Sequence, residues 1–448
     1  MRHDYQLTKY RSGTIGEIWA MSWPLMITIF SSSFMYFVDR VYLARYSVEA
    51  MNALAIGGIW SFFLLVIPLS ICEITEVFVG KYNGAGKKRE AAFPVWQMLW
   101  TCLFLWPVFS ILSRLIAHYI FGTDSQEAIY LVTYLNFAPI QLATIAISGF
   151  FIATGRVKVI TYATIGANLL NLALAPLFIF TLELGIQGAA YASGLSMTFL
   201  AACLSWTFLK SENRAHYNTD ACSFKPILWK EMLSVAGPSG LGRAIEVFAH
   251  CAFFAIMASA GFETLTAVTF VQSFYLLCCF LIDATAKGST AVLSNLIGAK
   301  AEIHVQSALK SALTLHSMIA LVVALFGYFS VDWLLQLTIG PQDTQLLANP
   351  DFIWSLRTAM LWMSLFFLFD GFAWIFAGQL TARSDTTFLL WVSLVANWLT
   401  YLLPIFVLIH YLEFQSAALA WAIIALNSIV MCTLYALRTK RYLPIAAT

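Results

Sequence analysis

The turn Asn83-Gly84-Ala85-Gly86-Lys87 has a second copy late in the chain, Ile297-Gly298-Ala299-Lys300. Pro24, in Ser22-Trp23-Pro24-Leu25, recurs at the same offset as Pro238, in Ala236-Gly237-Pro238-Ser239. Further landmarks follow in matching order: Ala153-Thr154-Gly155, Asn168 and Pro176 in the first half, Phe376-Ala377-Gly378, Asn397 and Pro404 in the second. Internal repeats in a hydrophobic chain are typical of transporters that bind substrate between two halves. The shared offset and order therefore predict a duplicated membrane fold.

The composition indicates that lipid is the main solvent of this chain. Of its 448 residues, 60% are hydrophobic and 11% are charged, and the mean hydropathy is +0.78. Soluble proteins carry about 25% charged residues. The net charge is only +2, and no basic face alternates with aromatic residues, so we expect no nucleic-acid partner.

Runs of apolar residues predict an all-α integral membrane protein with twelve transmembrane helices. A helix needs about 20 apolar residues to cross a bilayer. The predicted helices cover 15–43, 53–80, 92–121, 127–152, 159–183, 187–209, 230–260, 264–297, 306–338, 352–379, 387–411 and 415–437. We expect two six-helix lobes related by the internal repeat. The N-terminal lobe covers 1–210, a cytoplasmic linker covers 211–229, and the C-terminal lobe covers 230–448.

Basic residues gather in alternate loops, which sets the expected orientation. The loops on one side carry Lys81, Lys87, Lys88, Arg89, Arg156, Lys158, Lys210, Arg214, Lys225, Lys230, Lys300, Lys310 and Arg383, together with both termini. The opposite loops hold mostly acids, with Arg40, Arg45, Arg114 and Arg357 as exceptions near that face. The positive-inside rule then predicts that both termini are cytoplasmic. We expect a multi-pass protein of the plasma (inner) membrane.

Three carboxylates fall inside predicted spans: Asp39, Glu246 and Asp370. A charge at the centre of a membrane helix costs roughly 2.5–3.5 kcal/mol on insertion scales, so such groups usually face the bundle interior and have a function. Asp39 has a structural alternative, an interfacial pair with Arg40 or Arg45. Glu246 has one as well, because Arg243 precedes it by one helical turn. Asp370 has no cation within a turn or two in sequence, so function is favoured most strongly there.

A desolvated carboxylate can take up a proton or bind a hard cation such as sodium through oxygen. Either event would couple an ion gradient to movement. Asp283 and Lys287 are spaced i,i+4 with the acid first, which favours a structural ion pair instead. No phosphate-binding glycine loop or catalytic cluster is visible in the sequence, so we expect neither an enzyme nor a cofactor.

Several short motifs follow one another along the chain. They are Trp23-Pro24 before Asp39, the turn 83–87, and Gly185-Ile186-Gln187-Gly188-Ala189-Ala190. They continue with Ala377-Gly378, Ser384-Asp385-Thr386, Asn397-Trp398 and Leu403-Pro404. In these motifs the chain resembles the multidrug and toxic compound extrusion (MATE) transporters.

This resemblance implies an antiporter that exchanges sodium ions or protons for organic, often cationic, compounds. It matches Asp39 to a coupling-ion site in the N-terminal lobe, with Asn171 and Ser193 beside it, and Pro24 to a proline that bends the first helix. In a sodium-coupled branch, Glu246 and Asp370 match acids of the C-terminal lobe. The chain departs from the pattern at Ala175, where some relatives carry a second acid, and at Phe366, where a Tyr can supply an oxygen.

The leading hypothesis is therefore a secondary-active exporter of small organic substrates that works by alternating access. It is expected to be a monomer surrounded by membrane lipid, with sodium bound at Asp39 or at Glu246 and Asp370 if sodium is the coupling ion. The choice between sodium and protons stays open. The alternative is a lipid or lipid-linked-sugar flippase of related fold, which would need a cationic interior built on Arg243 and Lys287.

Overall fold

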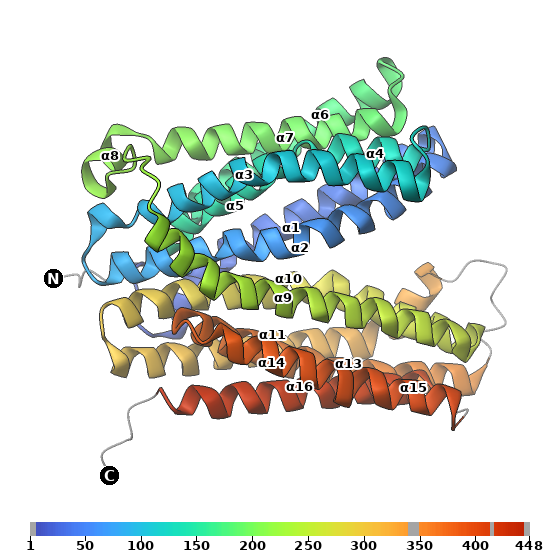
Figure 1. Ribbon diagram of the computed structural model, residues 1–448. Helices are drawn as coiled ribbons and strands as arrows, with labels where there is room; N and C mark the ends of the chain where they lie inside the picture. Colours follow the sequence, from blue (N-terminus) through green and yellow to red (C-terminus); the bar gives the residue numbers. More distant parts are fainter. Residues whose placement is uncertain (1–5, 339–348, 413–415, 443–448) are drawn as a thin grey trace, which may run out of the picture. The chain divides into compact units, whose positions relative to one another are not determined.

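The structure of the protein is a computed structural model that describes residues 6–338, 349–412 and 416–442. Within these ranges the chain is almost entirely helical (Figure 1). Eleven helices in the described residues are long and apolar enough to cross a membrane, and one bent helix pair makes a twelfth span. The predicted all-α membrane fold is confirmed.

The predicted spans correspond closely to the observed helices. The first group comprises α1 (Ile15–Tyr46), α2 (Val48–Gly84), α3 (Phe93–Ile116), α4 (Gln126–Leu135), α5 (Ala138–Ala153), α6 (Val157–Pro176), α7 (Gly185–Phe208) and α8 (Ser211–Tyr217). The second group comprises α9 (Pro226–Met257), α10 (Phe262–Gly298), α11 (Glu302–Thr338), α13 (Pro350–Ala382), α14 (Thr386–Ala396), α15 (Leu403–His410) and α16 (Ala417–Lys440).

The span predicted as one helix over 127–152 is broken. Helices α4 and α5 meet at an angle of 42° across Asn136 and Phe137. Pro139 lies in the first turn of α5 and has no N–H to continue the hydrogen-bond ladder of α4. The π-helical turns Leu177–Thr181 and Asn397–Leu402 also lie next to prolines, Pro176 and Pro404.

Contacts divide the chain into two compact units whose limits differ from those of the sequential lobes. Among the described residues, the first unit holds 6–9, 23–240 and 291–301, and the second holds 10–22, 241–290, 302–338, 349–412 and 416–442. One change of unit falls within α1 immediately before Trp23, and another falls within α9 after Gly240. Both lie within two residues of the repeated prolines, Pro24 and Pro238. The lobe limits 1–210 and 230–448 stay a prediction.

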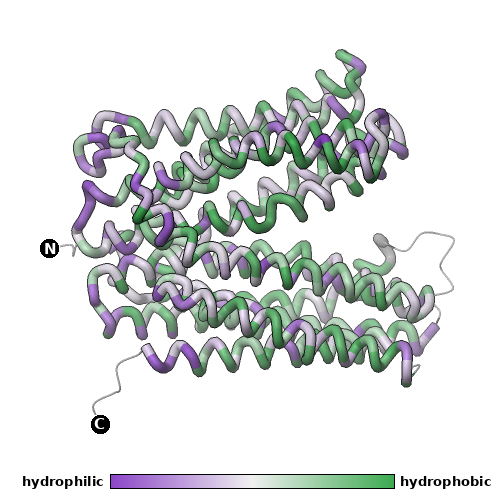
Figure 2. Tube along the Cα trace, viewed as in Figure 1, coloured by the Kyte–Doolittle hydropathy of each residue, from purple (hydrophilic) through white to green (hydrophobic). Residues whose placement is uncertain are grey.

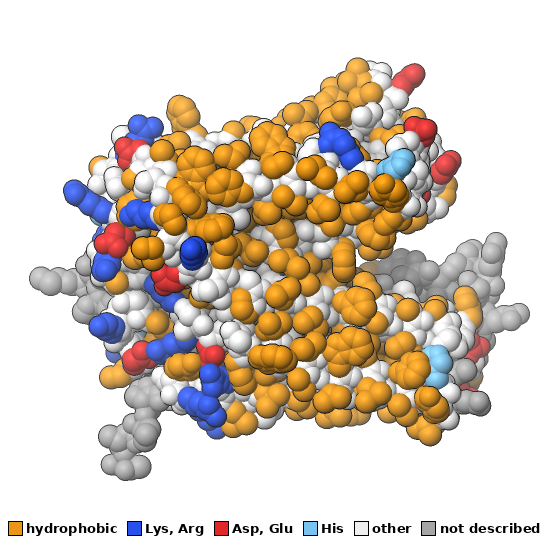
Figure 3. Space-filling model, viewed as in Figure 1, with side chains coloured by type: hydrophobic (Ala, Val, Ile, Leu, Met, Phe, Trp, Pro, Cys, Tyr) orange, Lys and Arg blue, Asp and Glu red, His pale blue; other side chains and the backbone are white. Residues whose placement is uncertain are grey.

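Each unit has its own apolar core. In the first, α2 packs against α4 and α5, and α7 packs against α5 and α6. In the second, α13 packs against α11 and α16 around the buried side chains of Phe253, Phe367, Tyr401 and Trp421. In both units the helices are hydrophobic along most of their length (Figure 2), and charged side chains gather mainly at helix ends (Figure 3).

The last turns of α10 belong to the first unit and lie against the end of α2. Asn83 Nδ2 donates a hydrogen bond to Asn295 Oδ1 at 2.7 Å, and Asn295 Nδ2 donates to the carbonyl of Ala153 at 2.9 Å. This polar contact joins the two copies of the repeated turn inside one compact unit.

One face of α3 holds the backbone of the linker predicted over 211–229. Trp96 Nε1 donates to the carbonyl of Thr219, and Trp100 Nε1 donates to that of Cys222. Between these two, Gln97 Nε2 donates to the carbonyl of Ser223 at 3.1 Å, and Gln97 Oε1 accepts from the amide of Lys225 at 2.7 Å. The linker is therefore an ordered segment fastened along α3.

Candidate functional site

The first candidate site surrounds Asp39 on α1. Ser193 on α7 donates its hydroxyl hydrogen to Asp39 Oδ2 at 3.0 Å. Asn171 on α6 donates from Nδ2 to the Ser193 hydroxyl at 3.3 Å. All three side chains are buried. The structure thus brings together the three residues that the resemblance grouped, from three different helices.

Two oxygens of this cluster have no hydrogen-bond partner among the described residues. They are Asp39 Oδ1 and Asn171 Oδ1, and both are buried. Buried polar atoms in proteins are almost always paired, so an unpaired oxygen calls for an explanation such as an ion or a proton. Carboxylate, amide and hydroxyl oxygens are also the ligands that hard cations prefer. The cluster can accept either a proton or a small cation.

Tyrosines from α1 and α4 lie near this cluster, and sequence reasoning missed those on α4. The rings of Tyr130 and Tyr134 stack at 5.5 Å, and the Tyr134 hydroxyl donates to Gln141 Oε1 at 3.5 Å. Tyr36 and Tyr130 lie within electrostatic range of Asp39. The ring pair sits in the apolar core of the first unit.

The second candidate site contains Glu246 on α9. Ser393 on α14 donates to Glu246 Oε1 at 3.0 Å, and the Tyr435 hydroxyl on α16 lies 3.3 Å from the same serine hydroxyl. His250 Nδ1 lies 3.1 Å from the carbonyl oxygen of Glu246. Glu246 is half-buried. The serine and tyrosine come from helices more than a hundred residues away, so sequence spacing could not reveal them.

Asp370 on α13 belongs to the same region. The Tyr275 hydroxyl on α10 donates to Asp370 Oδ2 at 2.9 Å. The rings of Tyr275 and Phe366 are 5.0 Å apart. A tyrosine hydroxyl therefore does reach Asp370, although Phe366 carries none, and it comes from another helix.

Glu246, Asp370 and Arg243 are grouped electrostatically. The two carboxylates lie within electrostatic range of each other, and Arg243 lies close enough to interact electrostatically with each of them. The Arg243 guanidinium also stacks over the ring of Trp374 at 4.3 Å. The structural alternative for Glu246, a pair with Arg243, and a joint ion site with Asp370 both stay predictions. The predicted Asp283–Lys287 ion pair is confirmed, with 3.3 Å between Lys287 Nζ and Asp283 Oδ2.

Pro24 interrupts the hydrogen-bond ladder of α1, and its carbonyl is tied to a neighbouring helix. Thr161 on α6 donates to the Pro24 carbonyl at 2.9 Å, and Thr28 donates to it at 2.8 Å. The Thr28 and Thr161 hydroxyls are also 3.0 Å apart. The hydroxyls therefore fix the backbone at the point where a proline weakens the helix.

Comparison with known proteins gives a consistent result. The MatE family model matches residues 24–177 and 238–407. The chain is 21% identical over 401 residues to a probable multidrug resistance protein NorM of Acinetobacter baylyi, covering 85% of this chain and 86% of that protein. It is 30% identical over 158 residues to Protein DETOXIFICATION 43 of Arabidopsis thaliana, but it spans only 29% of that longer relative.

A solved structure has the same fold. It is described as the outward-facing conformation of a multidrug resistance MATE family transporter, and it aligns with a TM-score of 0.86. The alignment covers 99% of this chain and 98% of that chain at 19% identity.

Proposed function

Since the chain belongs to the MatE family, the multidrug and toxic compound extrusion transporters, we propose that it is a secondary-active antiporter. It exports small organic, often cationic, compounds in exchange for sodium ions or protons. The observation that carries this proposal is a pair of oxygens, Asp39 Oδ1 and Asn171 Oδ1, which are buried between three helices without a partner among the described residues.

The coupling step follows from the chemistry of that cluster. A proton on Asp39 would supply a donor where Asn171 Oδ1 is an unused acceptor. A sodium ion would instead draw on the oxygens of Asp39, Asn171 and Ser193. Either event changes the packing of α1, α6 and α7, and so biases the equilibrium between conformations with different substrate affinity.

Pro24 is the proposed hinge for this change. A proline within a helix removes one backbone hydrogen bond and permits bending. The Thr28 and Thr161 hydroxyls, which donate to the Pro24 carbonyl, would stabilise one bend angle of α1. Glu246 and Asp370 are the proposed second ion site, with Tyr275 and Ser393 as hydroxyl partners.

The remaining features of the proposal concern the cellular setting. The proposed transporter is a monomer of two six-helix lobes in the plasma (inner) membrane. The loop charges predict that both of its termini are cytoplasmic. The two mid-span cations do not support the flippase alternative, which needs a cationic interior. Arg243 stacks on Trp374, and Lys287 forms an ion pair with Asp283.

The test uses the purified protein in proteoliposomes loaded with a cationic dye. Sodium and pH gradients are imposed separately, and dye efflux is measured for the wild type, Asp39→Asn and Asp370→Asn. Asp124→Asn, which changes an exposed acid on a loop, is the matched control. We expect efflux driven by at least one gradient and its loss in Asp39→Asn. Normal gradient-driven efflux in both test variants would show that neither acid couples transport.

A further inference from the structure

We propose that α11 carries a binding site for a phospholipid whose zwitterionic headgroup bears a primary amine, that is, a phosphatidylethanolamine. The site combines an apolar groove, a buried hydroxyl inside it and an ion pair beside its last turn. It lies outside the Asp39 and Glu246 clusters and goes beyond the proposed antiport function.

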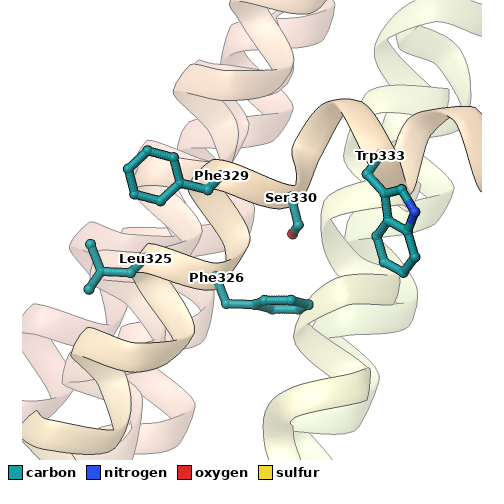
Figure 4. A pocket seen from close by; sticks show the side chains of 5 residues that line it. All are labelled: Leu325, Phe326, Phe329, Ser330 and Trp333. Atoms are coloured by element: carbon teal, nitrogen blue, oxygen red, sulfur yellow. The ribbon is translucent and has the colours of Figure 1, made fainter.

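The groove lies on an exposed side of α11 and has a volume of about 410 Å³. It is lined by Leu325, Phe326, Phe329, Ser330 and Trp333 (Figure 4). Phe326 forms one wall and stacks on Phe274 of α10, with ring centroids 5.9 Å apart. Phe329 is 77% exposed and Trp333 is 58% exposed. The groove is therefore formed by aromatic side chains on a membrane-spanning helix.

A polar atom points into this apolar space. The Ser330 hydroxyl lies between Phe326 and Trp333 (Figure 4), and the side chain is 8% exposed. It makes no hydrogen bond within the described part of the chain. A buried hydroxyl without a partner is costly, by roughly 1–3 kcal/mol in mutational data. A ligand that only filled the groove with hydrocarbon would leave this cost in place, whereas an acyl ester oxygen could accept from Ser330.

A pair of opposite charges lies beside the last turn of the groove, next to Trp333 in sequence. Arg357 on α13 donates from one guanidinium nitrogen to both Asp332 oxygens, at 2.7 and 3.0 Å. Asp332 follows Leu325 and Phe329 at helical spacing, so it lies on the same face of α11 one turn further along. Both charged side chains are exposed, and the guanidinium has further N–H groups to donate.

The length of the stripe fits one leaflet of a bilayer. Exposed apolar side chains continue down the same face of α11 at Phe329, Leu325 and Val322. Val322 lies ten residues below Asp332, about 15 Å along a helix. This is half of the ~30 Å hydrocarbon core. Exposed tryptophans, Trp333 and Trp354, flank the ion pair, as is typical of the membrane–water interface.

The charge pattern decides which headgroup fits. The phosphate of a phosphatidylethanolamine would accept from Arg357, and its ammonium would donate to Asp332. A phosphatidylglycerol carries only negative charge, which Asp332 repels. The quaternary ammonium of a phosphatidylcholine has no N–H to donate. Selectivity of roughly fivefold is expected from an exposed charge contact of this kind.

The experiment labels the full-length protein in nanodiscs with diazirine phospholipids that differ only in headgroup. The labelled residues are located by mass spectrometry. We expect ethanolamine probes to label 318–335 roughly fivefold more than choline or glycerol probes. Asp332→Asn should remove this preference, while Asp124→Asn, an exposed acid elsewhere, should keep it.

A second variant separates the groove from general lipid contact. Ser330→Ala keeps the groove apolar but removes the unpartnered hydroxyl, so it should lower labelling by the ethanolamine probe without lowering the melting temperature. Equal labelling by all three probes would mean bulk lipid only and would overturn the proposal. Labelling confined to other helices would overturn it as well.

Discussion

Gly84 and Gly298, the matched glycines of the repeated turn, each lie against the backbone next to the other. A Cβ on Gly84 would lie 1.9 Å from the Asn295 carbonyl oxygen, and one on Gly298 would lie 2.2 Å from that of Lys81. Lys81 and Asn295 each stand three residues before one of these glycines. The contact is therefore reciprocal. In each copy of the turn, the missing side chain of the glycine lets the backbone of the other helix end pack against it.

Adding a methyl group at this contact should destabilise the protein. We expect Gly84→Ala to lower the free energy of unfolding by about 1–3 kcal/mol, because backbone atoms block the new Cβ. Gly58→Ala, in the same helix with no described atom within 4 Å of the new Cβ, is the control. It should leave stability unchanged or raise it by up to about 1 kcal/mol. Thermal unfolding in detergent measures both, and equal stability of the two variants would contradict the close packing of Gly84 on Asn295.

Ser193 should matter to ion coupling through its hydroxyl. Ser193→Ala removes the hydrogen bond to Asp39 Oδ2, and about 1 kcal/mol of interaction is expected to be lost. We expect the coupling ion to bind roughly fivefold more weakly, so the ion concentration that gives half-maximal efflux should rise roughly fivefold. Ser193→Thr should retain function because it keeps the hydroxyl. Ser196→Ala, a buried serine on the same helix, is a second comparison.

Tyr275 should contribute to the second acidic site. Tyr275→Phe keeps the ring that packs on Phe366 and removes the hydroxyl that donates to Asp370. If that site binds the coupling ion, the variant should need a steeper gradient for the same efflux while melting at nearly the same temperature. A matched Tyr328→Phe change, at an exposed position on α11, should have no effect. Transport indistinguishable from the wild type would remove Tyr275 from the proposed site.

The hydrogen bonds between Gln97 and the linker backbone should protect the linker from proteolysis. Gln97→Leu removes two hydrogen bonds to the linker backbone, about 1–3 kcal/mol of local stability. Chymotrypsin should then cut after the exposed Phe224, between the two residues that Gln97 holds, roughly tenfold faster. Gln187→Leu, whose amide donates to Tyr191 on its own helix, should not change the rate. A cutting rate that Gln97→Leu leaves unaltered would show that the linker is held by other contacts.

The loop between α13 and α14 should respond to acid. Burial raises the pKa of Asp385, but hydrogen bonds from Arg438 and Tyr442 outweigh it and hold the pKa below its usual value. A carboxylate with a lowered folded-state pKa stabilises the fold above its unfolded pKa of about 3.9 and loses this effect as the pH falls.

Asp385→Asn should therefore melt at a lower temperature than the wild type near pH 7, and the difference should shrink toward pH 3. Asp220→Asn, at an exposed position, should follow the wild type at every pH. A melting-temperature difference between Asp385→Asn and the wild type that stays constant across this range would mean that the stabilisation does not come from the charge of Asp385.

The sequence predicted the helices well because hydrophobic length alone identifies a membrane span. It missed the break at Asn136, since Pro139 in an apolar run permits either a kink or a new helix start. It located Asp39, Glu246 and Asp370 because a charge is conspicuous among apolar residues. It could not find Tyr275, Ser393 or Tyr435, because aromatic and hydroxyl side chains are common in such helices and only tertiary packing selects these three.

The placement of residues 291–301 in the first compact unit has a consequence for synthesis of the protein. A ribosome that has made the first six spans has not yet made Asn295, to which Asn83 donates its hydrogen bond. Until that segment is inserted, the Asn83 amide has no such acceptor and the surface of Gly84 has no covering backbone. Early folding intermediates should therefore be open at this helix end. A gene split between the two halves should yield a stable first half only when the second is expressed with it.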